Sequence, residues 1–143
     1  MSDEGVAHVA HNHPDVELRI PADSAFLAVL RTATAGLAAR LDFTLDDIED
    51  LRIAVDEACA MVLPQAREDS QLTCTFDLED ARLTVAVTAE CDSPRPPNRD
   101  GFAWTVLAAL TNEVSAEVTG DRLTVTLARG TSDAGAHVNA GPE

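Results

Sequence analysis

The order of periodic segments predicts an α+β fold, a two-layer sandwich in which three helices cover one face of a largely antiparallel (mixed) sheet of about five strands. A short strand is followed by two helical segments, and two later pairs of alternating segments are separated by a third helical segment. Strands that alternate between apolar and polar residues have one face that needs cover, and the helices supply it. A chain of 143 residues is long enough for one such domain.

Five segments show the alternation expected of strands. Residues 16–20 alternate and stop at Pro21. Residues 71–78 and 83–89 place apolar side chains on one face and mostly threonine on the other, with a short turn between them. Residues 114–118 and 122–127 form a second pair, joined by a Thr-Gly-Asp sequence that is typical of hairpin turns. The chain is therefore expected to contain two antiparallel hairpins.

Capping residues mark the first two helices. Asp23 or Ser24 can cap a helix that runs to about residue 40, because a short polar side chain accepts a hydrogen bond from the exposed N–H groups of the first turn. Thr44 caps the second helix, whose first turns are rich in aspartate and glutamate, as the helix dipole favours. Pro64 interrupts this helix because proline cannot donate the next hydrogen bond. In both helices, apolar residues recur every three or four positions and predict one buried stripe.

A proline-rich loop precedes the third helix. Residues 90–100 contain three prolines and have no periodicity, so they are expected to form a long loop at the edge of the sheet. Residues 101–111 regain helical spacing. The polar residues 1–14 and the Gly-rich residues 130–143 are predicted to be disordered tails around a domain at residues 15–129.

The composition excludes several classes of function. Acidic residues outnumber basic ones by 25 to 10, and the resulting formal charge of -15 repels phosphate backbones and anionic membranes, so neither nucleic acid nor membrane is an expected partner. The acidity either only maintains solubility or provides a face for a basic protein, and the sequence leaves both readings open. No apolar run reaches the roughly 18 residues of a membrane span, and no secretory signal is apparent, so a cytoplasmic protein is expected. Three cysteines without CxxC spacing predict neither a disulfide framework nor a metal site.

Two segments carry a resemblance to a known family. The sequences IEDLRIAVDEACAMV, from residue 48, and GFAWTVLAALTNEV, from residue 101, together with the predicted order of elements, resemble the anti-sigma regulatory factors of the GHKL (histidine kinase-like ATPase) fold. The resemblance covers residues 16 to 129. It implies a Mg-ATP site built from three short sequence boxes.

The first box implied by the resemblance is Glu-x-x-x-Asn on the second helix. In the family the glutamate is a general base and the asparagine oxygen ligates Mg²⁺. Here Glu57 matches the glutamate, but Met61 stands in place of the asparagine. Because Mg²⁺ prefers hard oxygen ligands, the methionine thioether cannot replace an amide oxygen. Glu57 is also predicted to point away from the apolar stripe of its helix, so that it faces a site or solvent.

The adenine and phosphate boxes also depart from the family pattern. The family's Asp-x-Gly box recognises adenine, and the aligned positions here are Ala89 and Cys91. Its Gly-x-Gly box lets backbone N–H groups approach phosphates at a helix N-terminus, and here it reads Gly101 and Ala103 with bulky Phe102 between them. We therefore expect a degenerate nucleotide site, a vestigial Glu57, and no cofactor unless this site still binds ATP and Mg²⁺.

The resemblance implies an anti-sigma factor that sequesters an alternative sigma factor of the stress or sporulation class. An anti-anti-sigma factor, a STAS-domain protein, would release the sigma factor by partner switching, and the anti-sigma factor would be a homodimer. The candidate sigma-binding residues are Arg31 on the first helix and the acidic residues Asp46, Asp47 and Asp50 at the start of the second. Two alternatives remain open at this stage: an active serine/threonine kinase that acts on the anti-anti-sigma protein, and a sensor that binds a small ligand in the degenerate pocket.

Overall fold

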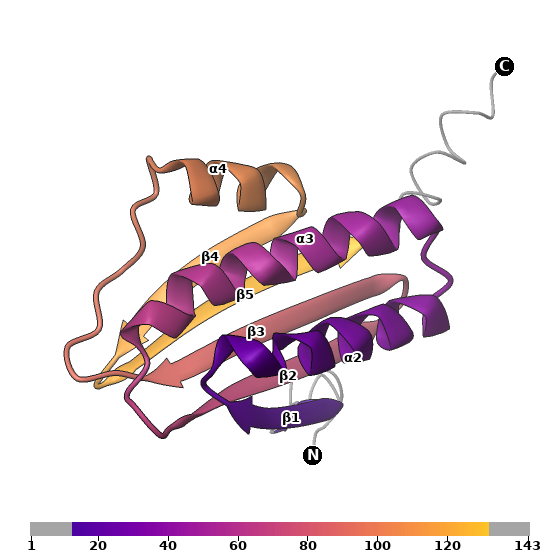
Figure 1. Ribbon diagram of the computed structural model, residues 1–143. Coiled ribbons are helices and arrows are strands. Elements are labelled where there is room, and N and C mark those ends of the chain that lie inside the picture. Colours follow the sequence, from indigo (N-terminus) through magenta and orange to yellow (C-terminus); the bar gives the residue numbers. More distant parts are fainter. Residues whose placement is uncertain (1–12, 132–143) are drawn as a thin grey trace, which may run out of the picture.

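The computed structural model describes residues 13–131, which form a five-stranded sheet with three helices (Figure 1). The strands are β1 (Val16–Pro21), β2 (Gln71–Glu79), β3 (Arg82–Glu90), β4 (Glu113–Thr119) and β5 (Arg122–Gly130). The helices are α2 (Leu27–Arg40), α3 (Leu45–Val62) and α4 (Phe102–Ala109), and two short 3₁₀ turns, η1 (Ser24–Phe26) and η2 (Leu63–Gln65), lie before α2 and after α3. The predicted α+β fold is confirmed.

The sheet has the strand order β1-β2-β3-β5-β4, and every neighbouring pair is antiparallel. The sequence allowed a mixed sheet, which the described residues do not form. The two predicted hairpins are present, and their turns place Asp80 and Gly120 at positive φ. Glycine has no Cβ and aspartate tolerates this region better than most residues, so both turns suit their sequences. Pro21 ends β1 on an edge strand, where a missing N–H is tolerated.

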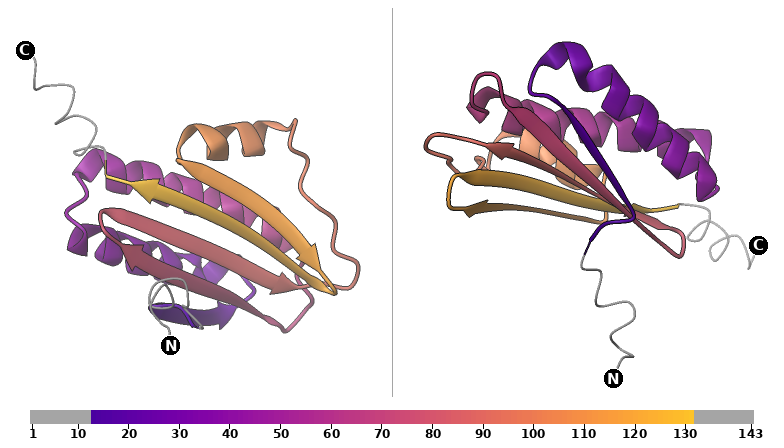
Figure 2. Two further views of the ribbon diagram at one scale, coloured as in Figure 1. Left: turned by 180° about the vertical axis from the view of Figure 1, so that it is seen from behind. Right: turned by 90° about the horizontal axis from the view of Figure 1, so that it is seen from below.

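All three helices lie on the same face of the sheet, and the other face is left open (Figure 2). Helix α3 runs diagonally across the sheet and lies between α2 and α4 (Figure 1). Its apolar stripe is buried against the strands, as the spacing predicted, and includes Leu51, Val55, Ala58 and Val62. No helix in the described part of the chain has the length and hydropathy of a membrane span.

The helix ends agree with the capping residues in the sequence. Thr44 Oγ1 accepts a hydrogen bond from the Asp47 N–H group at 3.1 Å and starts α3. Helix α3 ends at Val62, and Pro64 falls in the following 3₁₀ turn. Asp23 also acts as a cap, as predicted, but the segment that it starts is the 3₁₀ turn η1. Helix α2 itself begins at Leu27.

The last strand extends one residue beyond the predicted domain end. Gly130, assigned to a C-terminal tail, is the last residue of β5, and the Thr131 hydroxyl donates a hydrogen bond to Asp47 at 3.3 Å. The ordered part of the domain therefore reaches at least residue 131. The remainder of the two predicted tails, residues 1–12 and 132–143, lies outside the described residues.

A buried ion pair joins the start of α3 to the last residues of strand β5. Arg129 on β5 donates a hydrogen bond to Asp47 at 2.7 Å and to the Leu110 carbonyl oxygen, at the end of α4, also at 2.7 Å. The Asp47 side chain is only 2% exposed, and Asp50 lies 3.4 Å from the same guanidinium. The sequence placed Asp47 on a surface for a protein partner. That assignment is corrected, because Asp47 is buried against Arg129.

Replacing Asp47 with alanine is expected to lower the free energy of unfolding by about 3 kcal/mol, because it leaves the buried guanidinium of Arg129 without its main partner. Urea denaturation followed by circular dichroism measures this change. The matched control is Glu49→Ala, which breaks an exposed ion pair with Arg52 on the same helix and is expected to cost less than about 1 kcal/mol. Equal losses in the two variants would contradict the structural role of Asp47.

The thiols of Cys59 on α3 and Cys74 on β2 face the core. The pKa of each thiol is raised to about 12, mainly by burial, and at Cys59 the nearby Cys74 and Asp56 contribute to the rise. Above pH 9, unfolded chains lose thiol protons that the native state keeps, so the free energy of unfolding is expected to fall as the pH rises toward 12. Urea denaturation across this pH range tests the trend, and the double variant Cys59→Ala/Cys74→Ala should flatten it. If the free energy of unfolding of the double variant fell with pH as steeply as that of the wild type, the pH dependence would belong to other groups.

Candidate functional site

Three of the predicted site residues converge near the C-terminal end of α3. Met61, Gly101 and Ala103 line a hollow of about 360 Å³ between this end of α3, the loop of residues 91–101 and the start of α4. Its other lining residues are Gln65, Arg95, Pro96, Pro97, Asn98, Phe102 and Trp104. Glu57 is half-buried one turn before Met61 and is not among the residues that line the hollow. The structure thus brings together the metal and phosphate positions but not the general base.

The two positions expected to recognise adenine are buried. Ala89 and Cys91 are each 1% exposed and belong to the core cluster. Ala89 pairs with Leu123 across β3 and β5, and the Cys91 N–H group donates to the Asp121 carbonyl oxygen at 2.7 Å. Burial raises the pKa of the Cys91 thiol, so it stays neutral. Neither side chain offers a carboxylate that could accept a hydrogen bond from an amino group.

The start of α4 differs from an open phosphate loop. Gly101 is the N-cap of α4 in an extended conformation, and a Cβ at this position would meet the Asn98 carbonyl oxygen at 3.2 Å. The glycine therefore allows the chain to pack against its own turn. Phe102 follows with 82% of its surface exposed, whereas Trp104 packs toward the core under the Arg99 guanidinium, 4.7 Å from the ring centroid.

Side chains of the protein itself fasten the loop of residues 91–101. Gln65 bonds to Arg95 twice: its amide group donates to the Arg95 carbonyl oxygen at 3.0 Å, and its amide oxygen accepts from the Arg95 N–H group at 2.9 Å. Arg67 forms ion pairs with Asp92 at 2.9 Å and with Asp121 at 3.0 Å. The hydrogen bond from Arg67 lowers the pKa of Asp121, so this contact persists in mild acid.

Sequence reasoning missed Gln65, Arg67 and Arg99. Gln65 lies 30 residues from Arg95, and Arg67 lies 54 residues from Asp121. Contacts over such separations leave no periodic signal in the sequence. The prolines did mark the loop, but they did not indicate what holds it.

These residues do not fit a Mg-nucleotide. Arg95 is the one charged side chain that lines the hollow, and no lining residue carries a carboxylate. The Met61 thioether occupies the position of the expected oxygen ligand and is packed against the core. Within residues 13–131, no three His, Cys, Asp or Glu side chains are grouped so that they could hold a metal ion.

The candidate partner residues lie elsewhere. Arg31 on α2 forms an ion pair with Asp56 on α3 at 2.8 Å, and both side chains remain substantially exposed. Asp46 is exposed on the first turn of α3, Asp50 is half-exposed beside Arg129, and Asp47 is buried. A surface for a partner can therefore include Arg31, Asp46 and Asp50, but not Asp47.

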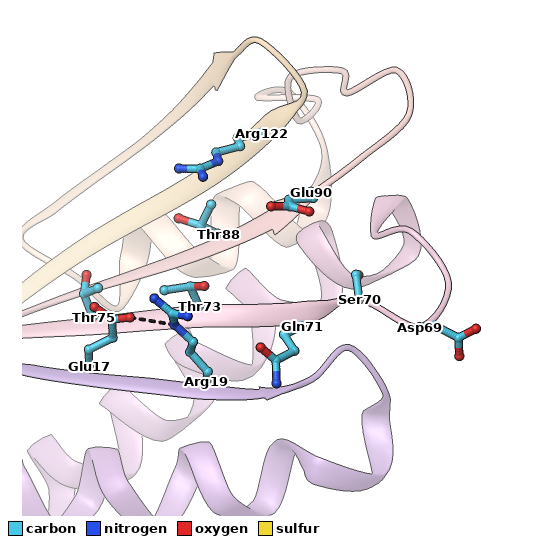
Figure 3. Close-up of a pocket in the computed structure, with 10 residues that line it drawn as sticks. All are labelled: Glu17, Arg19, Asp69, Ser70, Gln71, Thr73, Thr75, Thr88, Glu90 and Arg122. Carbon is cyan, nitrogen blue, oxygen red and sulfur yellow. Dashed lines mark hydrogen bonds and ion pairs between the residues drawn. The ribbon is translucent and has the colours of Figure 1, made fainter.

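A larger depression, of about 790 Å³, lies on the open face of the sheet (Figure 3). Threonines of β2 and β3 line its middle, and they lie between Arg19 of β1 and Arg122 of β5 (Figure 3). Arg19 is held by Glu17 at 2.7 Å. None of the residues predicted to form the site lines this depression.

Comparison with known proteins identifies the family. Residues 20–129 match the model of the histidine kinase-like ATPase domain. A protein named serine-protein kinase RsbW from Halalkalibacterium halodurans is 38% identical over 84 residues, which cover 58% of this chain and 52% of that protein. A protein of the same name from Bacillus cereus is 40% identical over 74 residues, which cover 50% of this chain and 46% of that protein. Another, from Bacillus velezensis, is 37% identical over 81 residues, which cover 54% of this chain and 51% of that protein. The chain spans about half the length of the curated relatives it matches. The resemblance seen in the sequence is confirmed, and the chain belongs to the histidine kinase-like ATPase domain family.

Proposed function

We propose that this protein is an anti-sigma factor that works by binding rather than by phosphoryl transfer. It sequesters an alternative sigma factor of the stress or sporulation class, and a STAS-domain anti-anti-sigma factor releases that sigma factor by partner switching. The protein acts in the cytoplasm as a homodimer. Two findings support this function: the chain belongs to the histidine kinase-like ATPase domain family, and it is similar to proteins named RsbW.

The observation that carries the proposal is the hollow beside Met61. Its lining supplies no carboxylate and no oxygen ligand on α3, while Ala89 and Cys91 are buried in the core. The metal, adenine and phosphate positions therefore all lack the chemistry that the family's Mg-ATP site requires. A scaffold with an altered site can still bind proteins through its surface, since function depends on sites and not on the fold.

Glu57 is then a remnant of the general base or a contact residue. A general base must reach the proton that it removes, within hydrogen-bond distance or through one water. Glu57 does not line the hollow, and no metal ligand accompanies it on the next helical turn, where Met61 stands. We assign it no catalytic step.

The sigma-binding surface is the exposed side of the α2–α3 pair around Arg31. The ion pair with Asp56 holds the Arg31 guanidinium at the junction of the two helices, and arginine has five N–H donors, so others remain for a partner. Ile53 lies one turn before Asp56 on α3 and is 39% exposed, which adds apolar area beside the charges. Asp46 and Asp50 extend this surface toward the start of α3.

The runner-up is an active serine/threonine kinase that acts on the anti-anti-sigma protein. The name serine-protein kinase, carried by the relatives from Halalkalibacterium and Bacillus, favours it. It requires that Mg-ATP bind in a hollow whose residues do not fit that ligand. Nucleotide binding therefore separates the two functions.

Reversing the charge of Arg31 is expected to weaken binding of the cognate sigma factor at least about tenfold, which corresponds to about 1.4 kcal/mol. Because Arg31→Glu also places a carboxylate beside Asp56, the fold needs its own control. The double variant Arg31→Glu/Asp56→Arg restores an ion pair with exchanged charges. Binding is measured by biolayer interferometry with the purified sigma factor.

The exchanged pair distinguishes a contact from a structural role. If Arg31 contacts the sigma factor, the double variant recovers thermal stability but not affinity. If the double variant recovers affinity as well, Arg31 acts only through Asp56, and its assignment to the binding surface is wrong.

Mg-ATP is expected to leave the melting temperature of the protein unchanged within about 1 °C. A ligand at about one hundred times its Kd would stabilise the native state by about 2.7 kcal/mol and raise the melting temperature by several degrees. Differential scanning fluorimetry with ATP and Mg²⁺ provides the measurement. A clear rise, followed by Glu57-dependent transfer of phosphate to the cognate anti-anti-sigma protein, would establish the kinase instead.

A further inference from the structure

The loop before α4 holds positive charge that the protein does not neutralise itself. Within residues 13–131, six arginines form ion pairs with aspartate or glutamate, in a chain of formal charge -15. Arg95 and Arg99 are exposed and form no such pair. Two other arginines, Arg40 and Arg122, also form no such pair in this part of the chain, but Arg95 and Arg99 stand together in one loop beside the hollow.

The loop is fastened in a way that presents these two arginines. The two hydrogen bonds between the Gln65 amide and the Arg95 backbone hold this backbone and leave the Arg95 side chain available. Arg99 donates to the Ala116 carbonyl oxygen at 3.2 Å and stacks on Trp104, so one side of its guanidinium is fixed. Pro96 and Pro97 stiffen the chain between the two arginines. A surface that is ordered before binding loses less conformational entropy when a partner docks.

The hollow beside the arginines has apolar as well as polar walls. Met61, Trp104 and two prolines contribute to it, and Phe102 at its rim is 82% exposed. Arginine and aromatic residues at the centre of an interface contribute disproportionately to binding energy. An exposed phenylalanine next to an open hollow is therefore suited to a protein contact.

We propose that this surface, formed by Arg95, Arg99, Phe102 and the hollow, docks an acidic segment of a partner protein. An apolar side chain of the segment enters the hollow against Met61 and Trp104, while its carboxylates meet Arg95 and Arg99. The charges nearest the hollow favour such a segment: Arg95 lines it, Arg99 stands beside it, Asp92 is engaged by Arg67, and the exposed Asp100 offsets only one of the two arginines. At physiological ionic strength a Debye length of about 8 Å screens the more distant acidic residues.

The docking surface is separate from the proposed sigma-binding surface. Helix α4 and the docking surface at its start lie on the side of α3 that faces away from α2 and Arg31 (Figure 1). The two surfaces can therefore bind separate segments. A negative result for the docking surface would not contradict the proposed sigma-binding function, because the peptide test contains neither a sigma factor nor a nucleotide.

The test uses short synthetic peptides as probes and the fluorescence of Trp104, the single tryptophan of the chain, as the readout. A Glu-rich peptide with one central phenylalanine is expected to change Trp104 emission in a saturable way. The same peptide with lysine in place of glutamate, or with alanine in place of phenylalanine, is expected to bind at least about tenfold more weakly.

The variant Arg95→Glu should weaken the Glu-rich peptide at least about tenfold, because it reverses the charge at the hollow. Its fold should survive, since the hydrogen bonds to Gln65 use only the Arg95 backbone. The matched control is Arg40→Glu on α2, an exposed arginine without an ion pair within residues 13–131, which makes the same change in net charge. Circular dichroism checks both variants.

Three results would overturn the proposal. The first is that the Glu-rich peptide does not bind, and the second is that Arg95→Glu and Arg40→Glu have equal effects. The third is that phenylacetate, which carries the ring and a carboxylate without a peptide, binds as tightly as the Glu-rich peptide. That outcome would make the hollow a site for a small molecule.

Discussion

The position of α4 relative to α3 depends on one guanidinium. Arg129 on β5 reaches the Asp47 carboxylate at the start of α3 and the Leu110 carbonyl oxygen at the end of α4, so one side chain joins three elements. The pair is almost fully buried, and a buried charge without its partner is strongly destabilising. Because α4 is only eight residues long, fixing its last turn also limits where its first turn, and with it Phe102 and Ala103, can lie. The hollow at the other end of α4 thus depends on a contact far from it.

The sequence predicted most of the fold because burial there follows the period of each element. Strands β2 and β3 alternate in both sequence and burial, and Thr44 and Pro64 lie at the two ends of α3 as their chemistry requires. Asp47 could not be placed in this way. An aspartate in the first turn of a helix is favourable when exposed, and only the return of β5 82 residues later buries it.

The candidate site was predictable as a set of positions but not as a surface. The resemblance placed Met61, Gly101 and Ala103 in one site, and the structure brings them to one hollow. The alternation of residues 83–89 placed Ala89 on the apolar face of its strand, but nothing local showed that Cys91 packs into the core or that Gln65 and Arg67 hold the loop. Those features arise from pairings between distant residues, where side-chain geometry rather than local pattern decides the outcome.

The altered chemistry of the hollow and the fastening of its loop have a common consequence. Enzymes that enclose a substrate use loops that open and close, and such loops belong to the least stable parts of a structure. Here the segment after β3 is stiffened by prolines and tied by Gln65, by Arg67 and by the stacking of Arg99 on Trp104. A segment held at so many points is better suited to presenting a fixed surface than to closing over a nucleotide. The same loop that lacks the residues for phosphate therefore has the rigidity that protein recognition favours.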